Sequence, residues 1–210
     1  MSKKYELTDE TMEWGGHILH RIKALRDFNY VKAGDLGGWV ESEDNLSQYE
    51  KCWLYDDARV YGNAIVYGNA RVRDNAIVCD NARVCNYARV YGNAIVYGNA
   101  IVYGNARVYG NAIVYGNAIV CNYAIVCDNA VVCNNARIYN TKDYCIITGF
   151  GSRLSTTTFF RCKDDEIGVN CGCFNGTLDE FRDKVKETHK DNKYAKEYLL
   201  AIDMVKVHFS

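Results

Sequence analysis

A glycine-rich segment near the C-terminus contains the residue types that bind anions. Backbone amides, hydroxyl groups and a guanidinium occur together in residues 149–153 and in the three threonines that follow. Such groups are the donors that hold a phosphate or a carboxylate. The candidate ligand-binding residues are Gly151, Ser152, Arg153, Thr156, Thr157, Thr158 and Arg161. An ordinary polar β-turn is the alternative interpretation of the same segment.

Histidine and cysteine side chains could supply other chemistry. All four histidines lie outside the central repeat described below: His17, His20, His189 and His208. Cys171 and Cys173, with Cys145 and Cys162, could bind zinc, but their C-x-C spacing differs from that of a C-x-x-C knuckle. Buried small apolar residues are the alternative role for these thiols. The sequence therefore predicts no catalytic residue, no metal site and no cofactor.

The glycine-rich segment belongs to residues 139–210, which have the pattern of a small α+β module. Short apolar or alternating runs predict strands at 145–148, 156–161 and 167–173. Thr177 and Glu180 have the spacing of a capping box, which predicts a helix that ends near His189. A second helix is expected to bury Ala195, Tyr198, Leu199, Ile202 and Val205.

A six-residue repeat occupies residues 55–138. Alanine recurs every six residues from Ala58 to Ala136, and each unit reads aromatic or Cys, Gly/Asp/Asn, Asn, Ala, Arg/Ile, Val. The alternation of side chains along a strand points Ala and Val to one side, and Gly-Asn suits a tight corner with left-handed backbone. Three such walls close a coil of 18 residues. The repeat therefore predicts a parallel β-helix with a narrow apolar core.

This pattern resembles the hexapeptide-repeat, left-handed parallel β-helix proteins, and the left hand is implied by the resemblance. The amino-acid sequence of residues 21–28, 32–40 and 41–47 also resembles the start of uncharacterised hexapeptide-repeat proteins from phages, prophages and gut bacteria. The predicted fold is mainly β, with an N-terminal β cap (1–54), the β-helix (55–138) and a C-terminal α+β module (139–210). Residues 1–54 are assigned to the cap because an open coil end exposes unpaired strands.

An 18-residue period also stacks the outward side chains into columns. One face is expected to carry an apolar surface for self-association: Ile77, Tyr91, Ile95, Tyr109 and Ile113. The resemblance implies a homotrimer, and the alternative is that the C-terminal segment covers such a face. Another face is expected to stay solvated or to meet an anion, because it stacks Arg71, Arg89 and Arg107, which the period groups with Tyr67 and Tyr103.

The amino-acid composition argues against nucleic acids and membranes as partners. The chain has 25 basic and 26 acidic residues, so it lacks the basic excess that nucleic-acid binding requires. No apolar run approaches the roughly 18 residues of a membrane span, and the polar start has no signal-peptide core. The expected location is the cytoplasm, in a bacterial host cell if the protein is phage-derived, with the ten cysteines reduced.

The functional prediction combines these observations. Many proteins of the resembled family are acyltransferases with a histidine at the subunit interface, but no histidine of this chain lies in the repeat. We therefore expect a non-enzymatic oligomeric binding protein whose C-terminal module binds an anionic small ligand. The phage resemblance suggests a sponge that sequesters a nucleotide immune signal. A purely structural or protein-interaction scaffold and a hexapeptide-type acyltransferase are the alternatives.

Overall fold

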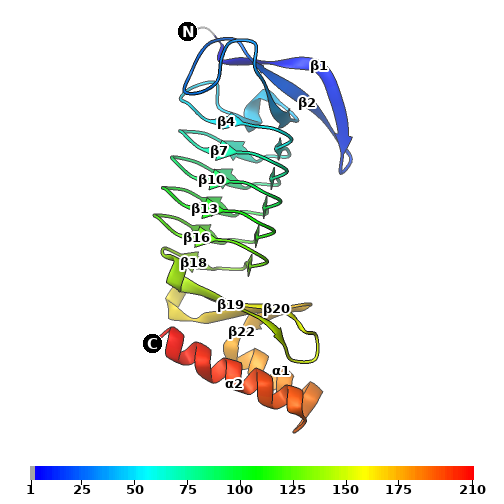
Figure 1. Ribbon diagram of the computed structural model, residues 1–210, viewed down its shortest axis with the longest axis vertical. Coiled ribbons are helices and arrows are strands. Elements are labelled where there is room, and N and C mark those ends of the chain that lie inside the picture. The colour runs from blue at the N-terminus through cyan, green and yellow to red at the C-terminus, as the bar shows by residue number, and fades with distance from the viewer. Residues whose placement is uncertain (1–2) are drawn as a thin grey trace.

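The computed structural model describes residues 3–210 and shows an elongated rod with a different cap at each end (Figure 1). The N-terminal residues cover one end of the rod and the C-terminal module covers the other. Between them the chain winds through short strands that stack coil upon coil. The predicted fold class, a parallel β-solenoid with a small C-terminal α+β module, is confirmed.

Three parallel sheets form the walls of the rod. The first wall contains β3 (Leu36–Val40), β5 (Arg59–Val60), β8 (Ile77–Val78), β11 (Ile95–Val96), β14 (Ile113–Val114) and β17 (Val131–Val132). The second contains β6 (Ile65–Val66), β9 (Arg83–Val84), β12 (Ile101–Val102), β15 (Ile119–Val120) and β18 (Arg137–Ile138). The third contains β4 (Trp53–Leu54), β7 (Arg71–Val72), β10 (Arg89–Val90), β13 (Arg107–Val108) and β16 (Ile125–Val126).

The interior of the rod is built as the repeat predicts. The alanine of every hexad and the residue two positions after it are completely buried; Val96 and Ala100 are both 0% exposed. The first corner residue has left-handed backbone, with φ of 69° at Gly98 and 59° at Asp80. Glycine, aspartate and asparagine are the residues that adopt this conformation at least cost. Each hexad is therefore one strand followed by one corner.

The coils begin before the recognisable repeat. β3 pairs in parallel with β5, through Trp39 and Arg59, and Leu46 forms a parallel bridge with Val66. The first wall therefore has six parallel strands, of which the hexads of residues 55–138 supply only five. The extra coil lies within residues 1–54.

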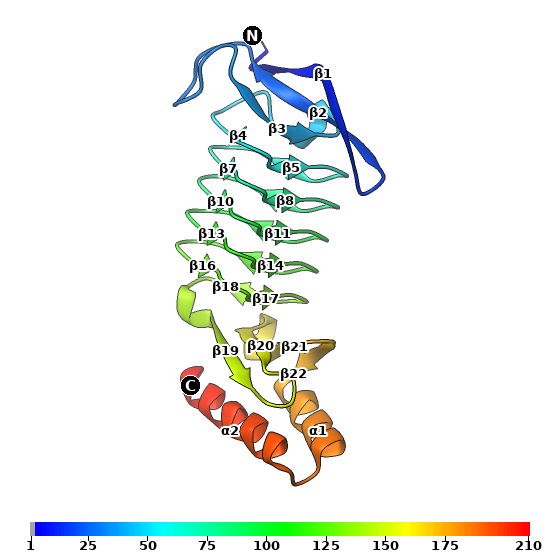
Figure 2. The same ribbon diagram turned by 45° about the vertical axis from the view of Figure 1, so that its right-hand side comes forward.

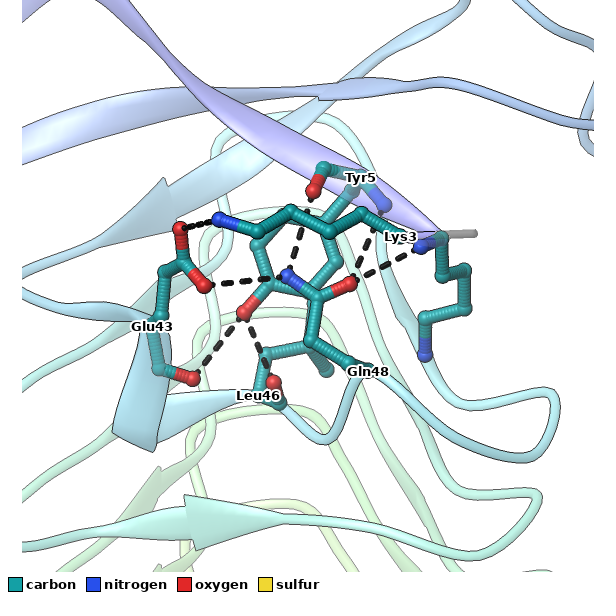
Figure 3. A network of polar contacts seen from close by, with 6 residues as sticks. Lys3, Tyr5, Glu43, Leu46 and Gln48 are labelled. Atoms are coloured by element: carbon teal, nitrogen blue, oxygen red, sulfur yellow. Dashed lines mark hydrogen bonds and ion pairs between the residues drawn. The ribbon is translucent and has the colours of Figure 1, made fainter. Parts of the chain in front are cut away.

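The rest of residues 3–54 forms a hairpin cap. β1 (Tyr5–Trp14) and β2 (His17–Ala24) are antiparallel, and β2 continues the first wall by pairing with β3. Polar contacts tie β1 to the first coil (Figure 3): Lys3 pairs with Glu43 at 2.7 Å, the Tyr5 hydroxyl donates to the Leu46 carbonyl at 2.7 Å, and the Gln48 side chain bonds the Tyr5 backbone. These bonds satisfy backbone groups at the open end of the solenoid.

The C-terminal module is a four-stranded antiparallel sheet with two helices. Its elements are β19 (Tyr144–Phe150), β20 (Ser155–Arg161), β21 (Ile167–Cys171), β22 (Phe174–Thr177), α1 (Leu178–His189) and α2 (Lys193–His208). Short 3-10 turns occur at Glu43–Asn45, Thr141–Asp143 and Lys163–Asp165. The capping box at Thr177 is confirmed. The helices enclose a second hydrophobic core that includes Phe159, Phe181 and Ile202.

The module closes the end of the rod and does not fold back along a face (Figures 1 and 2). β20 lies against the last coil, where the Val131 amide donates to Thr158 Oγ1 at 3.0 Å and Ala136 forms a bridge with Cys162. The alternative in which the C-terminal segment covers an apolar wall is therefore wrong. Neither helix in the described part of the chain is long and apolar enough to cross a membrane.

Candidate ligand-binding surface on the arginine wall

The predicted anion-binding loop directs its donors to neighbours within the module. The Gly151 amide donates to Glu197 Oε2 at 2.6 Å, so a carboxylate from α2 holds this amide. Ser152 Oγ lies 3.3 Å from His189 Nε2. The guanidinium of Arg153 packs over Gly172, where a side chain would collide with it. These three residues serve contacts between the loop and the rest of the module.

The predicted threonines and Arg161 are similarly engaged. Thr157 and Thr158 are buried, and Thr157 Oγ1 donates to Cys171 Sγ at 3.2 Å. Arg161 bonds the Phe209 carbonyl and lies 3.9 Å from Asp143. Thr156 is half-buried. A ligand site at this loop stays a prediction, because the contacts of the described residues do not gather these groups around one space.

The tyrosine columns belong to walls other than those predicted. The chain turns at the residue after each tyrosine, so the tyrosine continues the strand before it. Tyr55, Arg73, Tyr91 and Tyr109 therefore follow strands β4, β7, β10 and β13 of the third wall. The grouping of Arg71, Arg89 and Arg107 with Tyr67 and Tyr103 is wrong, because the latter two end strands of the second wall. The residues predicted for self-association likewise lie on two walls. The isoleucines lie on the first wall, and the tyrosines follow strands of the third.

Three arginines stack in register along the third wall, which the labels β7, β10 and β13 mark in Figure 2. Arg71 pairs with Arg89, and Arg89 with Arg107. Within residues 3–210, none of the three has a carboxylate oxygen within 4.0 Å. Like charges in directly opposed positions destabilise a sheet. An anion bound on this wall would relieve that repulsion.

A recess of about 260 Å³ opens at the N-terminal part of this wall. Its lining combines guanidinium groups and phenol rings with one carboxylate: Tyr30, Tyr55, Asp56, Arg71, Arg73, Arg89 and Tyr91. The Arg73 guanidinium lies 4.8 Å from the Tyr91 ring centroid, and that of Arg71 lies 5.5 Å from the Tyr30 centroid. The Tyr55 hydroxyl is protonated at neutral pH, as a tyrosine ordinarily is, and burial raises its pKa further. The recess can therefore hold both an anionic group and a flat ring.

A second recess, of about 280 Å³, lies further along the same wall. It shares Arg89 with the first recess and is lined by Tyr87, Arg89, Asn105, Arg107, Tyr123 and Ile125. Tyr87 is 61% and Tyr123 77% exposed, values that are high for tyrosine. Exposed aromatic rings beside arginines are typical of binding surfaces.

The two corners away from these tyrosines are closed by asparagine ladders. Asn63 bonds Asn81 at 3.1 Å, and this ladder continues through Asn99 to Asn135. The second ladder runs from Asn75 to Asn129. The third corner reads Asn69, Tyr87, Asn105, Tyr123 at the same positions, so the tyrosines interrupt the ladder there. The corner between the second and third walls therefore lacks this ladder, whereas the corner between the third and first walls has one.

A histidine–carboxylate pair lies near the N-terminal hairpin. His17 Nδ1 is 3.0 Å from Glu41 Oε1, and the His17 ring lies 4.8 Å from the Tyr61 ring. A hydrogen bond with His17 and another from the Gly62 amide hold the pKa of Glu41 below its usual range. Because a carboxylate only accepts, Nδ1 donates, which leaves Nε2 as a proton acceptor. This pair could not be predicted from local sequence, since 24 residues separate its members.

The cysteines were considered as possible metal ligands. All ten cysteines are free thiols, and burial raises the pKa of Cys145 and of Cys162 to about 11. In the chain from residue 3 onward, no three His, Cys, Asp or Glu side chains gather in a group that could hold a metal ion.

The predicted apolar column is present on the first wall. Ile77, Ile95 and Ile113 lie there in register, and each is half-buried.

Comparison with known proteins agrees with the solenoid, and one relative is named as an acetyltransferase. A family model described as the YdcK beta solenoid repeat matches residues 54–68, 58–74, 88–104, 102–115 and 106–122. A protein of Escherichia coli (strain K12) named "Uncharacterized acetyltransferase YdcK" is 37% identical over 62 residues, which cover 26% of this chain and 19% of the relative. The match thus spans about a fifth of the relative's length.

The relative's name corrects the prediction that the chain is not an enzyme. That prediction rested on the absence of histidine from the repeat, and the comparison instead points towards an acetyltransferase. Among the four histidines outside the repeat, His17 lies beside a carboxylate, that of Glu41. In its central coils, the chain is similar to the YdcK beta-solenoid repeat.

Proposed function

We propose that the third wall binds a small ligand that carries a phosphate or carboxylate group and a flat ring. Arg71, Arg73 and Arg89 would contact the anionic group, and Tyr55 and Tyr91 would pack against the ring. The observation that carries this proposal is the register of Arg71, Arg89 and Arg107, which face the same side without carboxylate partners among the described residues. Charge-assisted bonds to guanidinium groups are among the strongest polar contacts in proteins.

Nucleotides are the ligand class that combines these two features. A phosphate matches the fork of a guanidinium, and a base stacks on tyrosine or arginine. Sequestration of a host nucleotide signal, which the phage resemblance suggests, would be one use of such a surface. The C-terminal module then serves to close the rod, and the ligand lies along its side.

Titration calorimetry with adenosine 5′-monophosphate (AMP) tests this proposal. We expect Arg73→Gln to weaken binding by about tenfold, because it removes one charge-assisted bond of roughly 1.5 kcal/mol. Arg83→Gln is the control, since Arg83 occupies the repeat position of Arg71 and Arg89 but lies on the second wall and is exposed. Equal weakening by both variants, or no binding by the wild-type chain, would contradict the proposal.

Acetyl transfer is the second candidate function, and the relative's name favours it together with the His17–Glu41 pair. With Nδ1 held by Glu41, His17 Nε2 would take a proton from the hydroxyl or amine that accepts the acetyl group. Turnover of acetyl-coenzyme A should fall strongly in His17→Gln and persist in His20→Gln, whose ring hydrogen-bonds the Thr8 carbonyl. Equal activity in all three proteins would remove His17 from this role.

Self-association through the first wall is part of the proposal. Ile77, Ile95 and Ile113 form a continuous apolar column there. At the cap end of the column Trp14, which is 38% exposed, lies over Arg59, with 4.1 Å between the guanidinium and the ring centroid. Contiguous exposed apolar surface usually marks a partner surface. The trimer that the resemblance implies would bury this column between neighbouring chains.

A further inference from the structure

The two recesses of the third wall lie at opposite edges of the arginine column. The first contains Tyr55, Arg73 and Tyr91, which follow their strands. The second contains Tyr87, Asn105 and Tyr123, which precede theirs. Arg89 lines both recesses and therefore joins them. Any ligand that fills both must cross the wall obliquely over the arginines.

Each edge places two tyrosines two coils apart with a polar residue between them. A coil rise of ~4.8 Å separates the two tyrosines by roughly 9.6 Å. A flat ring needs ~3.5–4.0 Å to each neighbouring face, or roughly 7–8 Å in total. This spacing matches one flat ring in the second recess, where the residue between the tyrosines is Asn105. In the first recess the Arg73 guanidinium already stacks on Tyr91, so a ring there would lie against Arg73 and not between two tyrosines.

The polar residue at each edge gives the two spaces different chemistry. In the first recess the Arg73 guanidinium covers the Tyr91 ring at 4.8 Å, which makes a platform on which a base can stack. In the second recess the Asn105 side chain offers both a donor and an acceptor to the edge of a ring. Asp56, the one carboxylate in the lining, can accept a hydrogen bond from a base amino group.

The arginines occupy the path between the two spaces. Arg71, Arg89 and Arg107 lie on three successive coils. The same column continues with Trp53 before them and Ile125 after them, so the positive charge ends at both sides. A mononucleotide would leave one recess empty and Arg107 without a phosphate. A long single strand would find no further arginine in this column beyond the third.

We infer that the ligand of this wall is a dinucleotide, with one base in each recess and its phosphates on Arg71, Arg89 and Arg107. This inference rests on the proposed function, because it takes the wall to be a phosphate-binding surface. Beyond the proposed function, it specifies that the ligand is two nucleotides long and carries two bases. It also assigns a role to Tyr87 and Tyr123, which the first recess does not use.

Calorimetry on the full chain with AMP, the 5′-phosphorylated dinucleotide pApA and the corresponding tetranucleotide tests the inference. We expect pApA to bind with one molecule per chain and about tenfold more tightly than AMP, the order expected for one more stacked base. Tyr87→Ala and Tyr123→Ala should each remove most of this gain. Tyr49→Ala is the control, because Tyr49 is 67% exposed on the cap and lies in neither recess.

The outcomes separate the two proposals. Equal affinity for AMP and pApA would overturn the dinucleotide inference and leave the proposed anion-binding function in place. A further large gain with the tetranucleotide would also overturn it, because the wall would then follow a longer strand. If neither AMP nor pApA bound, the proposed function would fail together with the inference.

Discussion

Substitution of Gly98 by alanine should destabilise the solenoid by about 2 kcal/mol. Gly98 has φ of +69°, a conformation that costs an L-residue roughly 1–2 kcal/mol. An added Cβ would also lie 2.9 Å from the Gly116 nitrogen. That peptide cannot move away freely, because the Gly116 carbonyl accepts a 2.8 Å bond from the Asn99 amide. Steric crowding therefore adds to the conformational cost.

Gly98→Asp is the matched control for this prediction. Asp80 occupies the same column one coil earlier with φ of 59°, and its carboxylate accepts the Gly98 amide at 3.0 Å. An aspartate at 98 brings the same Cβ, but its carboxylate should accept a hydrogen bond from the Gly116 amide in the same way. This bond offsets the crowding and should leave stability within roughly 0.5 kcal/mol of the wild type. Urea unfolding of the three proteins measures these differences. Equal stability of the alanine variant and the wild type, or equal loss in both variants, would refute this account of the corners.

Three further predictions concern other parts of the chain. Burial raises the pKa of Tyr61 and of Tyr115 to about 12, so the stability that depends on their protonated form is present below about pH 10, the pKa of tyrosine in an unfolded chain, and should be lost as pH rises through about 12; urea midpoints that stay constant from pH 9 to about 12 would contradict this. Thr177→Ala removes the cap whose Oγ1 accepts the Glu180 amide and should cost about 1 kcal/mol, visible as faster amide exchange in α1 than in the wild type; unchanged exchange would show that the cap is dispensable. Ile95→Glu should reduce the molar mass seen by light scattering, because it places a charge within the proposed apolar interface; a wild-type chain that is already monomeric would refute self-association there.

The repeat made the solenoid predictable because each hexad encodes its own wall and corner. Periodicity identifies Ala58 to Ala136 as inward positions, and the structure confirms their burial. The first coil has a weaker sequence signal, because Leu36–Val40 and Leu46 take their places in the walls without the Asn-Ala signature of the hexads. Their pairing depends on long-range contacts with β5 and Val66, which no local pattern reveals.

The candidate site was harder to predict than the fold. The residues around Gly151 have anion-binding chemistry, but Glu197 reaches the Gly151 amide from a helix 46 positions away. The 18-residue period predicted the arginine column. It did not predict which tyrosines lie beside the arginines, because that depends on whether each tyrosine comes before or after the corner. Tyr30 joins the recess from the cap, and only the folded chain brings it there.

The most direct test of the anion-binding wall is a crystal of the protein soaked in tungstate, an anion with the tetrahedral shape of phosphate. Anomalous scattering locates tungsten without reference to any expected site. The account predicts the strongest peak between the guanidinium groups of Arg71, Arg73 and Arg89. A strongest peak beside Arg153 or Arg161, with none on the third wall, would contradict it.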